Sequence, residues 1–279
     1  MHMKCLGKTM FGRQKKIPLN FKIGAAITGI MTLLILMSFV YTPYDITKMD
    51  SASKLAAPSF QHLMGCDNFG RDIFSRVLKG MENTFVIAFL TVVIGTAGGV
   101  MIGAFTGYFG GWLDEVLMRI IDVVFAFPSI LLALVFVSIF GTGRYNVVAA
   151  LGVAFVPSFA RIVRGEFIKY REMDYVKSAR LAGVGTLRII FVHILPNTLT
   201  VLTSSIMIGF NNAVLAEAGM SYLGIGVQPP DASLGSMLSE SQTYLFSAPW
   251  YAVFPGLMII LLVLGFSLLA DGLKDPAAG

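Results

Sequence analysis

Long runs of apolar residues, separated by shorter polar segments, form the hydropathy pattern of this sequence. Six runs cover roughly residues 23–40, 83–107, 120–140, 146–163, 198–220 and 251–270. A hydrocarbon core about 30 Å thick is crossed by about 20 apolar helical residues, so each run is close to the length of a transmembrane helix. The pattern predicts an all-α integral membrane protein with about six transmembrane helices.

Two shorter patterns add detail. The second run is rich in glycine, VVIGTAGGVMIGAFTG, and small residues three or four apart let helix backbones approach closely, which predicts a helix-packing face. Before it, the apolar residues of 73–78 recur at helical spacing. They predict a short amphipathic helix that lies on the membrane or on the bundle.

The positions of lysine and arginine predict the orientation. Residues 1–22 and 161–193 are rich in them, whereas 221–249 contains none. Six spans place both basic segments on one side, which the positive-inside rule makes cytoplasmic, so we expect the N- and C-termini in the cytoplasm. The loop 41–82 should be external although it has five basic residues, and its five acidic residues offset them.

The expected organisation follows from these spans. It comprises a basic cytoplasmic N-terminus (1–22), a first transmembrane helix (23–40), an extracytoplasmic loop (41–82), a transmembrane core (83–271) with a cytoplasmic loop at 164–197, and a cytoplasmic tail (272–279). The basic start resembles a signal peptide. The first apolar run is long, however, and is followed by YTPYD rather than by a small-residue cleavage site, so we expect it to be retained.

Composition excludes several classes of function. Of the 279 residues, 56% are hydrophobic and 13% are charged, whereas soluble domains carry about 25% charged residues. The net charge of +5 is typical of cytoplasmic loops in a membrane protein, so we expect membrane lipid and no nucleic acid as a partner. Cys5 and Cys66 are expected on opposite sides of the membrane, so no disulfide is expected.

Candidate chemistry is sparse. The sequence has no Gly-x-x-x-x-Gly-Lys-Ser/Thr loop and no His-Glu-x-x-His helix, so we expect no nucleotide site, catalytic residues, metal site or cofactor. Residue types alone leave a Ser/His/Asp hydrolase open, and a membrane-embedded enzyme remains an alternative, as does a stand-alone channel or sensor scaffold. Asp122 follows Arg119 by three residues, which predicts an intrahelical ion pair.

The fifth run is the most polar, and polar residues inside spans usually face protein or water. Ser204, Met207 and Asn211 share one helical face, and Asn212 lies beside them. These four residues form either a wall of a hydrated translocation path or hydrogen bonds between helices of the bundle.

The segment YVKSARLAGVGTLRIIFVHILPN, residues 175–197, is a basic insert between two apolar runs. Its apolar and charged residues alternate as in a short amphipathic helix, which Gly183 and Gly185 can end. A second helical piece, from about Thr186 to Leu195, is expected to stop near Pro196. Two short helices with a glycine elbow predict a docking site for a cytoplasmic partner or, alternatively, an interfacial helix held by anionic lipid.

This insert resembles the cytoplasmic coupling loop, or EAA loop, of binding-protein-dependent ABC importer permeases. Ala179, Gly183 and Pro196 match the pattern, whereas Lys177 replaces its acidic residue and Ser178 replaces an alanine. Over residues 20–275, stretches such as GCDNFGRDIFSR, EAGMSYLGIGVQPPDASLGSML and SAPWYAVFPGL look like the second permease of dipeptide, oligopeptide and nickel importers.

The resemblance implies the fold and partners of a type I ABC importer in a bacterial or archaeal cell membrane. A homologous permease completes a heterodimeric pathway, two P-loop ATPase subunits dock below, and an extracytoplasmic solute-binding protein delivers the substrate. The implied substrate is a peptide, with nickel or a metal-chelate as the alternative. The residues implied to contact the ATPase are Tyr175, Val176, Lys177, Ser178, Ala179, Arg180, Leu181, Ala182, Gly183, Val184 and Gly185.

Overall fold

The computed structural model describes residues 19–274. Most of the expected N-terminal segment (1–22), most of the tail (272–279) and Cys5 lie outside that range. The described residues are almost entirely helical, and they form α1 (Leu19–Ser38), α2 (Ile73–Phe109), α3 (Gly111–Phe125), α4 (Ser129–Phe140), α5 (Arg144–Arg171), α6 (Asp174–Leu181), α7 (Thr186–Arg188), a π turn (Ile189–Ile194), α8 (Leu195–Tyr222), α9 (Leu234–Ser241) and α10 (Trp250–Lys274).

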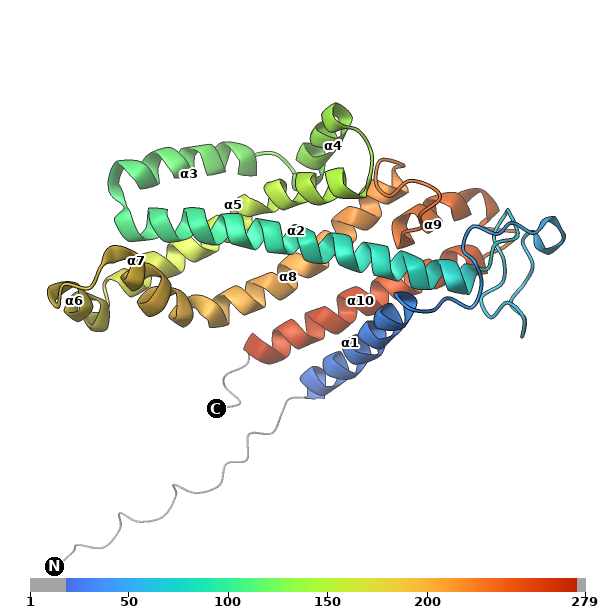
Figure 1. Ribbon diagram of the computed structural model, residues 1–279, viewed down its shortest axis with the longest axis horizontal. Coiled ribbons are helices and arrows are strands. Elements are labelled where there is room, and N and C mark those ends of the chain that lie inside the picture. The colour runs from blue at the N-terminus through green and yellow to red at the C-terminus, as the bar shows by residue number, and fades with distance from the viewer. Residues whose placement is uncertain (1–18, 275–279) are drawn as a thin grey trace, which may run out of the picture.

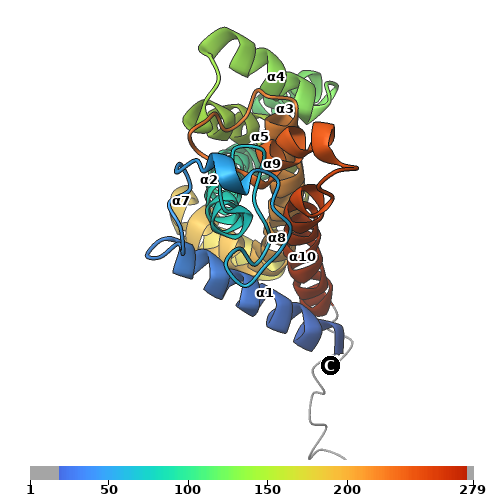
Figure 2. The same ribbon diagram turned by 90° about the vertical axis from the view of Figure 1, so that its right-hand side faces the viewer.

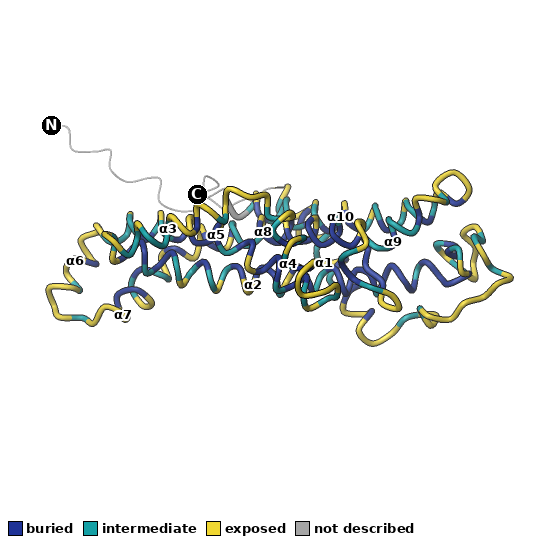
Figure 3. The backbone as a smooth tube through the Cα atoms, turned by 90° about the horizontal axis from the view of Figure 1, so that it is seen from above, coloured by how far each residue is buried: buried dark blue, intermediate teal, exposed yellow. Residues whose placement is uncertain are grey.

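The long helices run along one axis, so the molecule has two distinct ends (Figure 1). One end carries α6 and α7, and the other carries α9 and the loop between α1 and α2 (Figure 1). Seen along the bundle, α3 and α4 lie on one side and α1 on the opposite side (Figure 2). Buried residues follow the central helices, and many exposed residues lie at the two ends (Figure 3).

Five helices are long and apolar enough to cross a membrane, and α3 with α4 becomes a sixth span if this bent pair is counted as one. The span predicted over 120–140 is divided between α3 and α4, which meet at 85°. The bend falls before Pro128, which lacks a backbone N–H and disfavours helical geometry in the residue before it. The all-α membrane fold itself is confirmed.

The predicted short amphipathic helix over 73–78 is also wrong, because these residues are the first turns of α2. Asp72 caps the helix through a hydrogen bond from the Ser75 backbone N–H to its carboxylate, 2.7 Å long. From there, 37 residues continue without a proline, a length of about 55 Å that exceeds the hydrocarbon core. Ile73, Val77 and Leu78 are fully buried, so their apolar face packs inside the bundle.

The glycine-rich part of α2 packs against α5, which confirms the predicted packing face. Gly95, Gly99, Gly103 and Gly107 recur every fourth residue and therefore lie on one face of α2. A Cβ added to Gly99 would lie 2.3 Å from the Phe159 Cβ, and one added to Gly103 would lie 2.5 Å from the Ala160 carbonyl oxygen. The two helices can approach this closely only because these positions have no side chain.

The predicted stop near Pro196 is wrong as well, since α7, the π turn and α8 continue directly into one another. The Leu195 N–H donates to the Ile190 carbonyl, five residues back. This wider turn accommodates Pro196, whose ring would otherwise clash with the carbonyl four residues before it. The Asn197 side-chain amide also donates to the His193 carbonyl at 2.6 Å.

Candidate coupling loop and transport cavity

The end of α6 depends on Gly183. This residue has a φ of +78°, which L side chains rarely adopt. The Gly183 N–H donates to the Arg180 carbonyl and the Val184 N–H to the Ala179 carbonyl, both at 3.1 Å. These paired bonds form a Schellman ending. Gly185 has a φ of −61° and precedes α7, so Gly183 alone ends the helix.

The inner face of α6 is anchored to the bundle. Val176 is fully buried, and the partly buried Ala179 and Val184 pack against the same core. Through this face α6 contacts the π turn and α5. A short turn, in which the Met173 N–H donates to the Tyr170 carbonyl at 3.1 Å, joins it to the end of α5. The α6 helix is therefore packed against α5 and against the π turn that leads into α8.

The outer face of α6 is open to solvent. Leu181 is 90% exposed at its end, and Tyr175 is 41% exposed near its start. Lys177 lies 3.8 Å from the Glu172 carboxylate, and both groups are exposed, so this pair adds little stability. The remaining exposed residues of the predicted loop are Ser178, Arg180, Ala182, Gly183 and Gly185. Leu181 is therefore the large apolar side chain that α6 leaves most exposed.

Two arginines connect this region to the end of α2. Arg171 donates to the Gly107 and Tyr108 carbonyls at 3.3 and 3.2 Å, where the helix leaves carbonyls without intrahelical partners. The Arg180 guanidinium lies 5.5 Å from the centre of the Tyr108 ring, a cation–π distance. The α6 helix therefore contacts α2, α5 and the π turn that leads into α8.

Asp122 does not pair with Arg119 as predicted. Its carboxylate accepts a hydrogen bond of 2.8 Å from Arg161 of α5, and that guanidinium lies 4.1 Å from the centre of the Phe125 ring. Sequence spacing within one helix could not reveal a partner on another helix.

A cavity of about 400 Å³ opens between α4, α5 and α8. Phe155, Phe159, Ile162 and Ile208 give it an apolar wall. Its polar groups are three serine hydroxyls and the Asn212 amide, and its lining includes no charged side chain. Predominantly apolar walls with a few neutral polar groups are typical of small-molecule sites. The full lining is Ser129, Ile130, Phe155, Ser158, Phe159, Ile162, Ser205, Ile208, Gly209, Asn212, Leu215 and Ala216.

The four predicted pathway residues divide between two faces of α8. Asn212 is exposed and lines the cavity. Ser204 and Asn211 are buried at 7% and 9% exposure, and Met207 is half-buried. The face that reaches the cavity is offset by one residue from the predicted one and includes Ser205 and Ile208.

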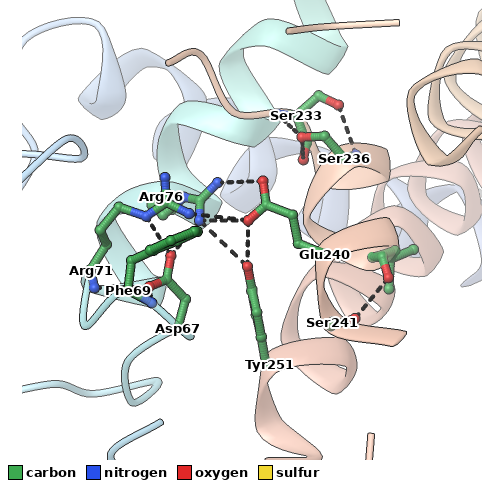
Figure 4. Close-up of polar contacts among 10 residues, drawn as sticks. Asp67, Phe69, Arg71, Arg76, Ser233, Ser236, Glu240, Ser241 and Tyr251 are labelled. Carbon is green, nitrogen blue, oxygen red and sulfur yellow. Dashed lines mark hydrogen bonds and ion pairs between the residues drawn. The ribbon is translucent and has the colours of Figure 1, made fainter. Parts of the chain in front are cut away.

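Sequence reasoning missed the role of Glu240. In the 41–82 loop Asp67 pairs with Arg71 and Arg76. Both arginines also pair with Glu240 of α9, which accepts a hydrogen bond from Tyr251 of α10 (Figure 4). The four-residue spacing of Asp67 and Arg71 was an available signal for a local pair. Glu240 lies 164 residues after Arg76, and no local pattern in the sequence indicated that the two would pair. Within residues 19–274, the acidic, histidine and cysteine side chains form no group of three that could hold a metal ion.

Residues 99–275 match the family model described as binding-protein-dependent transport system inner membrane component. The dipeptide transport system permease protein DppC of Alkalihalophilus pseudofirmus is 38% identical over 253 residues, which cover 91% of this chain and 83% of that protein. The glutathione transport system permease protein GsiD of Pectobacterium atrosepticum is 39% identical over 256 residues, covering 90% and 85%.

The solved structures show the same architecture. The MetNI methionine ABC transporter in an inward-facing conformation matches with a TM-score of 0.59 at 18% identity, over 70% of this chain and 93% of the matched chain. At that identity the likeness establishes the fold alone.

Proposed function

This chain belongs to the binding-protein-dependent transport system inner membrane components, and from this premise we propose how it works within an ATP-driven importer of peptides. It is a multi-pass membrane component and a permease rather than an enzyme. In our proposal, a homologous permease forms the other half of the pathway. Two P-loop ATPase subunits bind below, and a solute-binding protein docks on the extracytoplasmic side.

The observation that carries the proposal is the position of α6. It projects from the end of the bundle (Figure 1), it is anchored through Val176, and it joins α5 and α8, two of the three helices that line the cavity. When the ATPases close on ATP, α6 and its Schellman ending move as one body. The motion is passed to α5 and α8 and changes access to the cavity, as in alternating access.

We propose that residues 175–185 provide the ATPase contact, with Leu181 as its apolar centre. The basic residues Lys177 and Arg180 flank it and are exposed. Lys177 stands where the resemblance implies an acid, so the facing ATPase surface is expected to be neutral or acidic there. The sequence has no phosphate-binding loop of its own, which is consistent with ATP hydrolysis by another subunit.

Peptides are the substrate class that we propose. The relatives named above are dipeptide and glutathione permeases, and glutathione is itself a tripeptide. Serine hydroxyls and the Asn212 amide, set in an apolar wall, suit the neutral amides of a peptide backbone. Nickel is not favoured, because histidine, cysteine and carboxylate ligands are missing from the cavity lining.

We further propose that the cavity-facing side of α8 lines the pathway, with Asn212 and Ser205 as its polar groups. Ser204, Met207 and Asn211 remain part of the proposal as the adjoining face, reached only if α8 rotates. A difference in reagent access between the two faces would separate these roles.

The docking proposal is tested by purification from membranes. The wild-type chain is expected to bring down a P-loop ATPase and a homologous permease. Leu181→Glu is expected to reduce ATPase recovery roughly tenfold or more, because it places a charge at the apolar centre of the contact. Phe60→Glu, at a fully exposed phenylalanine in the loop at the opposite end, is the matched control and should leave recovery unchanged. Equal ATPase recovery from all three chains would contradict the docking site.

A further inference from the structure

Five ionisable side chains meet at the end of the molecule opposite α6. They come from four separate segments, and Figure 4 shows the arginines and Tyr251 lying around the Glu240 carboxylate. Asp67 and Arg71 lie in the loop before α2, Arg76 is on α2, Glu240 is on α9 and Tyr251 is on α10. The cluster shares no residue with the cavity or with the α6 loop.

Glu240 receives four hydrogen bonds in this cluster. Arg76 donates from Nη1 at 2.9 Å and from Nη2 at 3.0 Å, one to each carboxylate oxygen. Arg71 adds a bond from Nη2 at 3.2 Å, and the Tyr251 hydroxyl adds one at 2.5 Å. A bidentate arginine with two further donors is a strong arrangement for holding a carboxylate.

The groups that receive Glu240 are fixed independently of α9. Asp67 accepts hydrogen bonds from the backbone N–H groups of Phe69 and Arg71, at 2.8 and 2.9 Å. Its other oxygen accepts from Arg71 Nε at 2.6 Å and contacts Arg76 Nη1. Arg71 also lies over the Phe69 ring at 4.8 Å. We call Asp67, Arg71, Arg76 and Tyr251 the arginine socket.

The socket residues are more deeply buried than Glu240. Asp67 and Tyr251 are fully buried, Arg76 is 2% exposed and Arg71 is 7% exposed. The Glu240 side chain is 27% exposed, so it is the member closest to solvent. Without Glu240, the socket holds two guanidinium groups and one carboxylate, a buried net positive charge that is costly. The socket is therefore built to be occupied by an anionic group.

The ionic character of Glu240 agrees with this geometry. Burial alone would raise the pKa of its carboxyl, but the hydrogen bonds and charge of Arg76, together with Tyr251 and Arg71, hold that pKa below its ordinary value of 4.5. Glu240 is thus charged at neutral pH, and the contact is an ion pair.

The other end of α9 is attached differently. Gly235 packs directly on α8, where a Cβ would lie 2.2 Å from the Ala218 carbonyl oxygen. Glu217 of α8 is fully buried and accepts hydrogen bonds from Thr84 and Ser221, both at 2.7 Å. The Thr84 hydroxyl in turn accepts from the Leu234 N–H at 3.4 Å. Close packing on α8 holds the start of α9. In its second half Met237 and Ser241 are buried, and Glu240 is the charged side chain that ties this part of the helix to the arginine socket.

We propose that Glu240 and the arginine socket form an extracytoplasmic latch, which keeps the end of α9 against α2 and α10 and releases Glu240 when this side of the bundle opens. The proposal rests on the proposed function, because opening belongs to a transport cycle. Release turns α9 about its fixed start near Gly235. It also exposes the positive socket, so the latched state is favoured until another event stabilises the open one.

The reactivity of a cysteine placed on α9 measures how often the latch opens, in membranes that contain the complete transporter. Ser241→Cys is conservative, and Ser241 is 1% exposed, so a membrane-impermeant maleimide should react slowly from outside. Background comes from the parent chain. Its Cys66 is fully buried, and burial with the nearby Asp72 and Asp67 carboxylates raises the pKa of that thiol to about 11, so its reactive thiolate is scarce.

Three second-site variants are compared. Tyr251→Phe removes one hydrogen bond to Glu240 and keeps every charge, so labelling should rise about tenfold, the equivalent of one bond to a charged group. Glu240→Gln removes the ion pair and should raise labelling further. Asp231→Asn removes an exposed carboxylate from the turn before α9 and should change nothing.

The outcomes separate the latch from simpler explanations. Unchanged labelling in both Tyr251→Phe and Glu240→Gln would overturn the latch. An increase in Glu240→Gln alone would overturn it too, because the loss of a charge beside the thiol would explain that increase. Tyr251→Phe is small enough to fold even if Glu240→Gln does not reach the membrane. ATP-driven peptide uptake is measured on the same membranes. Its absence in the wild-type transporter would refute the proposed function, whereas the labelling order tests the latch itself.

Discussion

At the scale of single residues, the shape of the α6 loop rests on one backbone conformation. Gly183 has a φ of +78°, and a Cβ there would meet nothing within 4 Å. Gly183→Ala would therefore act through backbone strain alone, about 1–2 kcal/mol for an alanine in the left-handed region. We predict that it lowers ATP-driven uptake several-fold while the chain still inserts into the membrane.

Gly185→Ala is the matched control for this prediction. Gly185 also has open space around its Cα, but its φ is −61°, which alanine adopts without strain. Uptake assays and membrane immunoblots of both variants check the prediction. If the two variants transported equally well, the Schellman ending would have no part in coupling.

Also at this scale, Asn211 and Asn212 are neighbours with different surroundings. Asn212 is exposed in the cavity and Asn211 is 9% exposed. We predict that Asn212→Cys reacts with a water-soluble thiol reagent at least about tenfold faster than Asn211→Cys, and that ATP analogues change its rate. Labelling rates in membranes with and without nucleotide are the measurement. A faster Asn211→Cys would mean that the pathway follows the other face of α8.

At the scale of elements, the packing of α2 on α5 sets a sharp stability prediction. Leucine at Gly99 would bring its Cβ within 2.3 Å of the Phe159 Cβ and 2.8 Å of the Ala160 nitrogen. Overpacking of this kind typically costs about 1–3 kcal/mol. Gly99→Leu is expected to lower the melting temperature of the purified transporter in detergent by several degrees.

Gly165→Leu on α5 controls for that substitution, because Gly165 is exposed and has no neighbour within 4 Å of a built Cβ. Leucine is also the better helix former, so this variant should melt no earlier than the wild type. Similar losses in both variants would show that helix propensity, not the α2–α5 contact, decides stability.

The helices also show what a one-dimensional pattern can predict. Apolar length located the long helices, because membrane crossing demands it. The pattern did not reveal that residues 73–82 extend α2, since an apolar face looks the same whether it meets lipid or protein. It also missed the bend at Pro128 and the passage through Pro196. Pro128 lies at the break between α3 and α4, whereas Pro196 follows a π turn inside a continuous helix. Residue type alone does not distinguish the two cases.

At the scale of the whole molecule, the glycine ending of the α6 helix was predictable because its signals are local. Gly183 and Val176 lie within one short segment, and Gly183 is itself a position of the family motif. The cavity and the arginine socket were not predictable, because each joins residues from at least three separate segments. Only the folded bundle brings Glu240 to Arg76, and only it turns Asn212 rather than Asn211 toward the cavity.

The whole molecule also defines two ends with opposite tasks. In our proposal, the α6 loop receives motion from ATPase partners, and the latch on α9 resists opening at the other end. The long helices α2, α5 and α8 connect the two. An importer needs both features, since a substrate must enter from one side while the other is closed.

The central claim is that this chain is a permease subunit of an ATP-driven peptide importer. Uptake of radiolabelled dipeptide tests it most directly, in cells that lack this chain and in the same cells with the chain restored. We predict that only the restored cells accumulate dipeptide, that accumulation requires ATP, and that radioactive nickel uptake is the same in both. Equal dipeptide uptake with and without the chain, or restoration of nickel uptake alone, would contradict the account.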